Sequence, residues 1–89
     1  MKHLNIRIHG DVQGVGFRYE CKRKADELGV KGYVRNESDG TVYAEAEAEE
    51  DTFAKFISWC RTGPAYSHVS KIDISDAVLT GFKTFRIEF

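Results

Sequence analysis

The sequence predicts a two-layer α+β sandwich of the ferredoxin-like kind, and three observations predict it. Apolar patterns follow the order β-α-β-β-α-β, with a short strand added at the C-terminal end. Each of the two helices has one apolar stripe, so together they can cover only one face of a sheet. This order of elements is typical of a mostly antiparallel sheet with both helices on one side.

The first third of the chain alternates as a strand and then becomes helical. Leu4, Ile6 and Ile8 alternate with polar neighbours, which indicates a half-buried strand. The loop "GDVQGVGFR", residues 10–18, follows it. A helical stripe then ends at Gly29, a residue that commonly terminates helices, and it consists of Phe17, Cys21, Ala25 and Leu28.

The middle of the chain predicts a hairpin. "VKGYVRN" (residues 30–36) reads as the second strand, and Asp39-Gly40 is a strong turn signal. In the third strand, "TVYAEAEA" (residues 41–48), small alanines alternate with Tyr43, Glu45 and Glu47. The small side chains predict that a helix packs closely on this part of the sheet.

The last elements are a helix and two strands. The second helix is expected to begin near Asp51 or Thr52, either of which could cap it, and to end at "TGP", residues 62–64. "YSHVSKIDI" (residues 66–74) predicts a strand with a bulge near Ser70, which would bring Val69 into phase with the later isoleucines. The final strand is short. The helix has an apolar stripe, and apolar residues alternate along the last strand; they are Phe53, Phe56, Ile57 and Cys60 in the helix, and Phe85, Ile87 and Phe89 in the strand.

Composition narrows the classes of function. Residues 1–89 are expected to form a single domain, and a formal net charge of −1 favours neither nucleic acid nor membrane as a partner. No stretch is apolar enough for a signal peptide or a membrane helix. Cys21 and Cys60 are too few for a disulfide framework and predict buried free thiols, although a cross-link stays open if their helix faces meet. We expect a cytoplasmic monomer.

The loop before the first helix carries the clearest functional signal. Glycines at 14 and 16 let backbone N–H groups turn inward together, beside the positive end of the helix. Arg18 lies in the first helical turn, where a cation is slightly disfavoured by the helix dipole. Its fork of donors matches the oxygens of a phosphate. A tight strand-to-helix turn without function is the competing interpretation.

Other phosphate chemistries lack their residues. Neither cysteine is followed six positions later by arginine, as a cysteine phosphatase loop requires, and no nucleotide-triphosphate loop motif is present. No metal-ligand spacing occurs, so no cofactor or metal is predicted. The three histidines are interpreted as solvated strand residues, and they are His3, His9 and His68.

Three motifs together resemble the acylphosphatase family over nearly the whole chain. They are "VQGVGFR" at 12–18, "GYVRNESDGTV" at 32–42 and "GP" at 63–64. The resemblance implies metal-independent hydrolysis of acyl phosphates to a carboxylate and inorganic phosphate. The family's catalytic arginine matches Arg18, and its catalytic asparagine, which orients the attacking water, matches Asn36. The phosphate-binding backbone amides would be those of Gln13, Gly14, Val15, Gly16, Phe17 and Arg18.

The chain departs from the family pattern at a few positions. Asp11 precedes the loop, where relatives are often basic or neutral, and Tyr66-Ser67-His68 replaces the usual small residues after "GP". These departures bear on rate and substrate preference. The resemblance also implies that the Phe89 carboxylate could orient Arg18.

Two alternatives from other classes stay open at this point. A non-catalytic ferredoxin-like module would bind an anion or a partner without turnover. An accessory domain related to the carbamoyl-phosphate-handling maturation proteins would share the loop, but those proteins usually carry proline after the arginine, where Tyr19 stands here.

Overall fold

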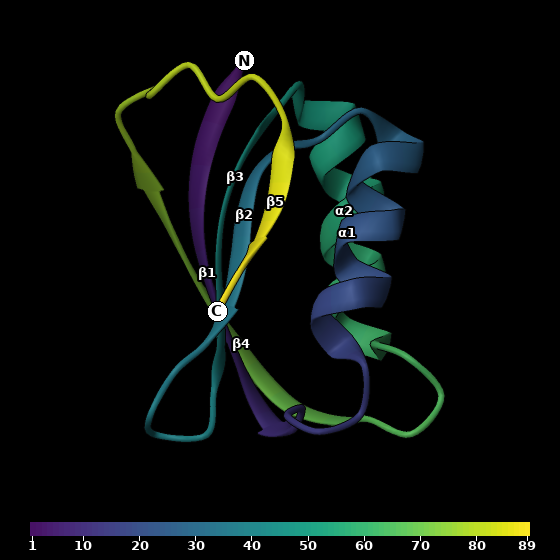
Figure 1. The fold of residues 1–89 in the computed structure, drawn as a ribbon. Helices are drawn as coiled ribbons and strands as arrows, with labels where there is room; N and C mark the ends of the chain where they lie inside the picture. The colour runs from purple at the N-terminus through teal and green to yellow at the C-terminus, as the bar shows by residue number, and fades with distance from the viewer.

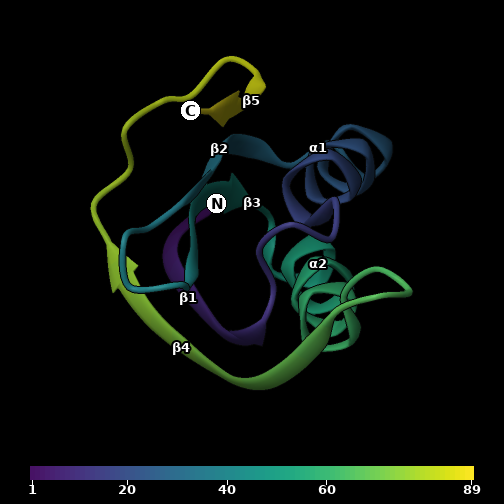
Figure 2. The same cartoon turned by 60° about the horizontal axis from the view of Figure 1, so that its bottom comes forward.

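The fold is a five-stranded sheet with two helices packed on one face, as Figures 1 and 2 show. The computed structural model describes all residues, 1–89. The strand order is β4-β1-β3-β2-β5, with β2 and β5 parallel and the other pairs antiparallel. The predicted ferredoxin-like sandwich is confirmed. Its elements are β1 (Lys2–Asp11), α1 (Phe17–Leu28), β2 (Lys31–Asn36), β3 (Val42–Ala48), α2 (Glu50–Thr62), β4 (His68–Ala77) and β5 (Phe85–Glu88).

The core fills the space between the helices and the sheet. The alternating residues of β1 and β3 that were expected to face inward are buried, and so are the predicted helix stripes except Leu28 and Ile57, which are partly buried. Both cysteines are free thiols. Because Ala44 and Ala46 are fully buried and small, the helices can approach the middle of the sheet closely.

The start of α2 differs from the sequence prediction. The helix begins at Glu50 with Glu49 as its N-cap residue, rather than at Asp51 or Thr52, and no side chain caps it. The carbonyl of Glu49 already accepts a hydrogen bond from the Phe53 amide at 2.9 Å. Acidic side chains in the first turn face the positive end of the helix dipole and support the earlier start.

The predicted bulge in β4 is confirmed. His9 pairs with Lys71, and the next residue, Gly10, pairs with Val69, which leaves Ser70 unpaired. Neither helix has the length and apolar character needed to cross a membrane.

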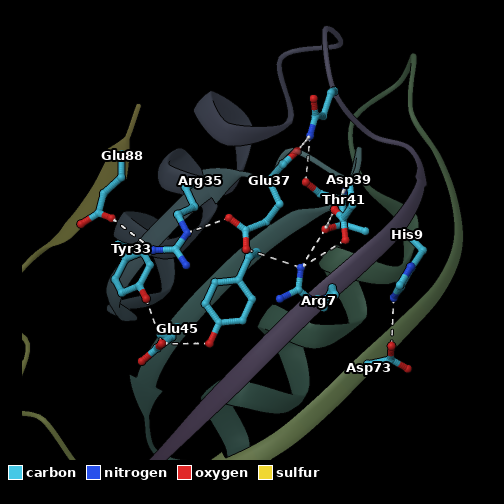
Figure 3. A network of polar contacts seen from close by, with 12 residues as sticks. Arg7, His9, Tyr33, Arg35, Glu37, Asp39, Thr41, Glu45, Asp73 and Glu88 are labelled. Carbon is cyan, nitrogen blue, oxygen red and sulfur yellow. Dashed lines mark hydrogen bonds and ion pairs between the residues drawn. The ribbon is translucent and has the colours of Figure 1, made fainter.

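The face of the sheet away from the helices carries a network of polar side chains, drawn in Figure 3. The hydroxyls of Tyr33 and Tyr43 donate to the same oxygen of Glu45 at 2.8 and 2.9 Å. Arg7 donates to the Thr41 hydroxyl at 2.9 Å, and Arg35 donates to Glu37 at 3.0 Å. The network therefore joins β1 to both sides of the β2–β3 hairpin.

His3 is the clearest error of the sequence interpretation. It is 3% exposed rather than solvated, and its two ring nitrogens lie 2.8 Å from Glu47 and 2.9 Å from Glu45. Because carboxylates only accept hydrogen bonds, the ring donates from both nitrogens and is charged. Burial opposes the charge, but the hydrogen bonds to Glu47 and Glu45 outweigh it and raise the pKa of His3.

The other two histidines lie nearer to solvent. His68 is exposed, as the sequence indicates, and His9 is partly exposed and pairs with Asp73 at 2.9 Å.

Candidate phosphate-binding site

The loop between β1 and α1 alternates the sign of its backbone φ angles. Gly14 has φ 73° and Gly16 has φ 77°, whereas no residue other than glycine has a positive φ. Val15 and Phe17 therefore have negative φ. Such alternation turns successive N–H groups toward one side and makes a concavity that suits an anion.

The donors of this loop are not used within the protein. The backbone N–H groups of Gln13, Gly14, Val15 and Gly16 donate no hydrogen bond to any protein acceptor. α1 begins directly after them at Phe17, so its own first amides lie beside the loop. The arrangement leaves several amide donors free for a ligand.

A cavity of about 230 Å³ lies against this loop and brings together the predicted residues of two separate motifs. Arg18 is the one charged residue in its wall, and Asn36 is its one side-chain amide. A cavity with a guanidinium and no carboxylate in its wall favours an anion. The residues that line it are Val12, Gly14, Gly16, Phe17, Arg18, Tyr19 and Asn36.

The direction of Asn36 follows from the alternation along β2. Val34 is fully buried beneath the helices, and Asn36, two positions later, shares its face of the strand. Since Asn36 is the last residue of β2, its side chain emerges at the edge of the core, where α1 begins. A strand-end amide is thereby brought to the loop from a distant part of the sequence.

Two of the predicted loop residues do not line the cavity. The Gln13 side chain donates to the backbone carbonyls of Glu37 and Thr41 at 2.8 and 2.9 Å, which ties the loop to the β2–β3 hairpin. Val15 faces a neighbouring cavity instead. Gln13 thus connects the two motifs that the site requires, because the hairpin follows directly after Asn36.

Arg18 is positioned by an aromatic ring that the sequence prediction did not identify. Its guanidinium lies 4.9 Å from the centre of the Phe89 ring, within range of a cation–π contact. No carboxylate, the terminal one of Phe89 included, pairs with Arg18 within 4.0 Å. The ring rather than the terminal carboxylate contacts Arg18. β5 pairs with β2, and β2 carries Asn36. A prediction of this strand pairing would have placed Phe89, which follows β5, near the site.

No cluster of three or more His, Cys, Asp or Glu side chains is arranged to hold a metal ion. The fold and the cavity define a ferredoxin-like domain with a cavity between a glycine loop and a strand end, lined by one cation and no carboxylate.

Comparison with known proteins identifies the family. The acylphosphatase family model matches residues 4–87. An acylphosphatase from Nocardioides sp. is 44% identical over 84 residues, which cover 94% of this chain and 85% of that protein. The chain belongs to the acylphosphatase family, and it is an enzyme of that type.

Solved structures agree with this assignment. The crystal structure of acylphosphatase from Bacillus subtilis superposes with a TM-score of 0.97 at 34% identity, over 100% of both chains. Full-length HypF, in its phosphate- and nucleotide-bound form, contains a similar region with a TM-score of 0.92 and 32% identity, covering 99% of this chain but 12% of HypF. The non-catalytic alternative is not favoured by these relatives.

Proposed function

We propose that this acylphosphatase holds the phosphoryl group of an acyl phosphate with the loop amides and Arg18, and that Asn36 positions the attacking water. The observation that carries the proposal is the single cavity lined by Gly14, Gly16, Arg18 and Asn36. The remaining predicted amides, those of Gln13 and Val15, belong to the same loop and have no acceptor in the protein. The products are a carboxylate and inorganic phosphate.

The substrate's own chemistry explains how so few groups suffice. The water oxygen forms a bond to phosphorus while the bond from phosphorus to the bridging oxygen breaks, and the electron pair leaves on the acyl carboxylate. One water proton passes to a phosphate oxygen, giving dihydrogen phosphate. The leaving acid has a pKa of roughly 4–5, like Asp and Glu side chains, so it departs without protonation. The protein supplies position and charge stabilisation.

Asn36 suits the role of a water-positioning residue. Its amide oxygen can accept a hydrogen bond from water while its NH₂ group donates elsewhere. Its side chain makes no hydrogen bond inside the protein, so both ends are available. We expect Asn36→Ala to lower kcat by roughly 10²-fold, typical of one lost positioned group, and to leave the inhibition constant of inorganic phosphate within about two-fold. Equal losses in both quantities would contradict this role.

The decisive experiment is hydrolysis of benzoyl phosphate in the presence of EDTA. Turnover that resists the chelator supports metal-independent catalysis. Phosphate binding without turnover would favour the non-catalytic module instead. Turnover that EDTA abolishes and Mg²⁺ restores would place a metal in the mechanism.

We further propose that residues 1–89 act as one domain, as a monomer in the cytoplasm. The outer face of the sheet carries a network of charged and polar side chains (Figure 3), which favours a monomer. Two buried free thiols suit a reducing compartment. Sedimentation equilibrium and cell fractionation test the two properties separately.

A further inference from the structure

We call the loop between β1 and α1 the phosphate loop, and the cavity lined by Arg18 and Asn36 the phosphate cavity. A second cavity, of about 480 Å³, opens beside the phosphate cavity. Neither the fold nor the proposed chemistry accounts for this second cavity. Gly16 and Tyr19 line both cavities, so the two are adjacent. Most of the second wall is apolar. Its apolar residues are Val15, Tyr19, Trp59, Pro64, Ala65 and Tyr66.

Pro64, Ala65 and Tyr66 of this wall come from the loop between α2 and β4, which lies beside the start of α1 in Figures 1 and 2. The Ser67 hydroxyl donates to the Pro64 carbonyl at 2.7 Å and holds the loop in its turn. Underneath, the rings of Phe17 and Trp59 are 5.4 Å apart. The phosphate loop is thus flanked by the β2–β3 hairpin on one side and by this loop on the other.

The two flanks of the phosphate loop, the β2–β3 hairpin and the α2–β4 loop, have different roles in the proposed reaction. Asn36 lines the phosphate cavity but not the second one. In phosphoryl transfer the attacking and leaving oxygens lie roughly in line, on opposite sides of phosphorus. If water enters beside Asn36, the acyl group departs on the side away from it, and the adjacent apolar cavity lies across the shared residues Gly16 and Tyr19.

Exposure and charge indicate what the cavity accepts. Tyr66 is 87% exposed and Tyr19 is 61% exposed, so neither ring is placed there by the needs of the core. The charged residues of the wall, Glu20 and Arg23, pair with each other at 3.0 Å and offer no single unpaired charge. Such a wall favours an uncharged, apolar group over a second anion.

We propose that this cavity is the acyl-group subsite, and that it selects acyl phosphates with aromatic or bulky aliphatic acyl groups over small or charged ones. The inference rests on the proposed function, because it assigns the leaving group of that reaction. Tyr66 is then a specificity-determining residue whose ring covers the acyl group. Removing that cover lowers the transition-state binding of large acyl groups and leaves small ones unaffected.

The test compares benzoyl phosphate with acetyl phosphate for the wild type, for Tyr66→Ala and for Val78→Ala. Val78 is a matched control, since it is 88% exposed and lies at the far end of β4. We expect the wild type to prefer benzoyl phosphate. Tyr66→Ala should reduce kcat/KM for benzoyl phosphate roughly five- to ten-fold, as partial loss of one ring contact implies. It should leave acetyl phosphate within about two-fold, and Val78→Ala should change neither.

A binding measurement adds a second readout that does not depend on turnover. Inhibition by phenylphosphonate should weaken in Tyr66→Ala, while inhibition by methylphosphonate and by inorganic phosphate should not. The subsite is overturned if Tyr66→Ala affects both substrates equally, if it affects neither, or if the wild type shows no preference. Absence of hydrolysis with both substrates would instead overturn the proposed function, so the two failures are distinguishable.

Discussion

Both ends of the sheet gather several backbone N–H groups in one place, and the two groups of amides differ in what they donate to. At the end where β1 begins, the amides of Thr80, Gly81 and Phe82 donate to the Glu47 carboxylate. At the end where β1 finishes, the amides from Gln13 to Gly16 donate to nothing within the protein. The first group of amides binds a side chain of the chain itself, and we propose that the second binds the phosphoryl group of the substrate.

The difference shows what separates a structural amide cluster from a functional one. Glu47 is 2% exposed and also accepts from charged His3 at 2.8 Å. Burial alone would raise its pKa, but the Thr80 amide, His3 and the amides of Phe82 and Gly81 together lower the pKa of Glu47 to about 2. The cluster at the start of β1 is therefore fully satisfied and holds the β4–β5 loop. The phosphate loop has its cation, Arg18, and unsatisfied donors.

The largest expected effect is the loss of the cation at the functional end. Arg18→Ala should lower kcat/KM for benzoyl phosphate by at least roughly 10²–10³-fold, or about 3–4 kcal/mol, the effect of one lost oxyanion donor. A larger loss is expected, because in the proposed mechanism Arg18 has two roles: it binds the substrate and it stabilises the developing charge. Steady-state kinetics measure it. The control is Arg61→Ala, an exposed arginine on α2, which should leave the rate unchanged.

Removing the charge at the structural end should affect stability instead of rate. Glu47→Gln keeps the shape of the side chain but leaves His3 charged beside a neutral group, and it turns an NH₂ group toward amide donors. We expect a loss of about 3 kcal/mol in the free energy of unfolding, in the range for a broken buried ion pair. Urea denaturation measures it, with exposed Glu27→Gln as the control. If Glu47→Gln lowered kcat/KM as strongly as Arg18→Ala, the contrast between the two ends would be wrong.

Acid should weaken the structural end within a defined pH range. The ordinary pKa of 4.5 falls to about 2 for Glu47 on folding. A lowered folded-state pKa stabilises above pH 4.5, and that contribution, about 3 kcal/mol, is lost as pH falls from 4.5 toward 2. His3 has the opposite sign, because its pKa is raised above 6.5 and its contribution is lost as pH rises beyond that value. Subtracting the unfolding profile of Glu47→Gln from that of the wild type isolates the acid step. A flat difference across this range would contradict the assignment.

The sequence predicted the features that depend on local residue patterns better than the features that depend on contacts between distant residues. Alternation placed Ile6, Ile8 and the alanines of β3 correctly, and the phase change between Val69 and Ile72 located the bulge at Ser70. These features follow from the spacing of neighbouring residues. The motif that joined Arg18 to Asn36 placed both residues at one cavity.

Features set by distant contacts were not predictable in the same way. His3 has the parity of an outward-facing residue, and nothing near it in sequence shows that the β4–β5 loop folds back over Glu47 and Phe82 contacts the His3 ring. The cation–π contact of Arg18 with Phe89 likewise depends on β5 pairing with the edge of β2. In both cases the partner comes from the last dozen residues, whose path the local pattern leaves open.

The smallest expected effect comes from comparing two glycines, one at each end of α1, that have nearly the same backbone conformation. Gly16 precedes α1 with φ 77°, and Gly29 follows it with φ 82°. A Cβ added at either position meets no atom within 4 Å, so alanine is penalised there by its backbone conformation alone. Each variant, Gly16→Ala and Gly29→Ala, should therefore lower the free energy of unfolding by about 1–2 kcal/mol.

The two variants should differ in phosphate binding, since Gly16 lines the phosphate cavity and Gly29 does not. We expect Gly16→Ala to weaken inhibition by inorganic phosphate several-fold while Gly29→Ala leaves it unchanged, because a shift in φ at Gly16 turns the adjacent amides away from one another. Equal inhibition constants in the two variants would mean that the alternation of φ in this loop serves only to start the helix.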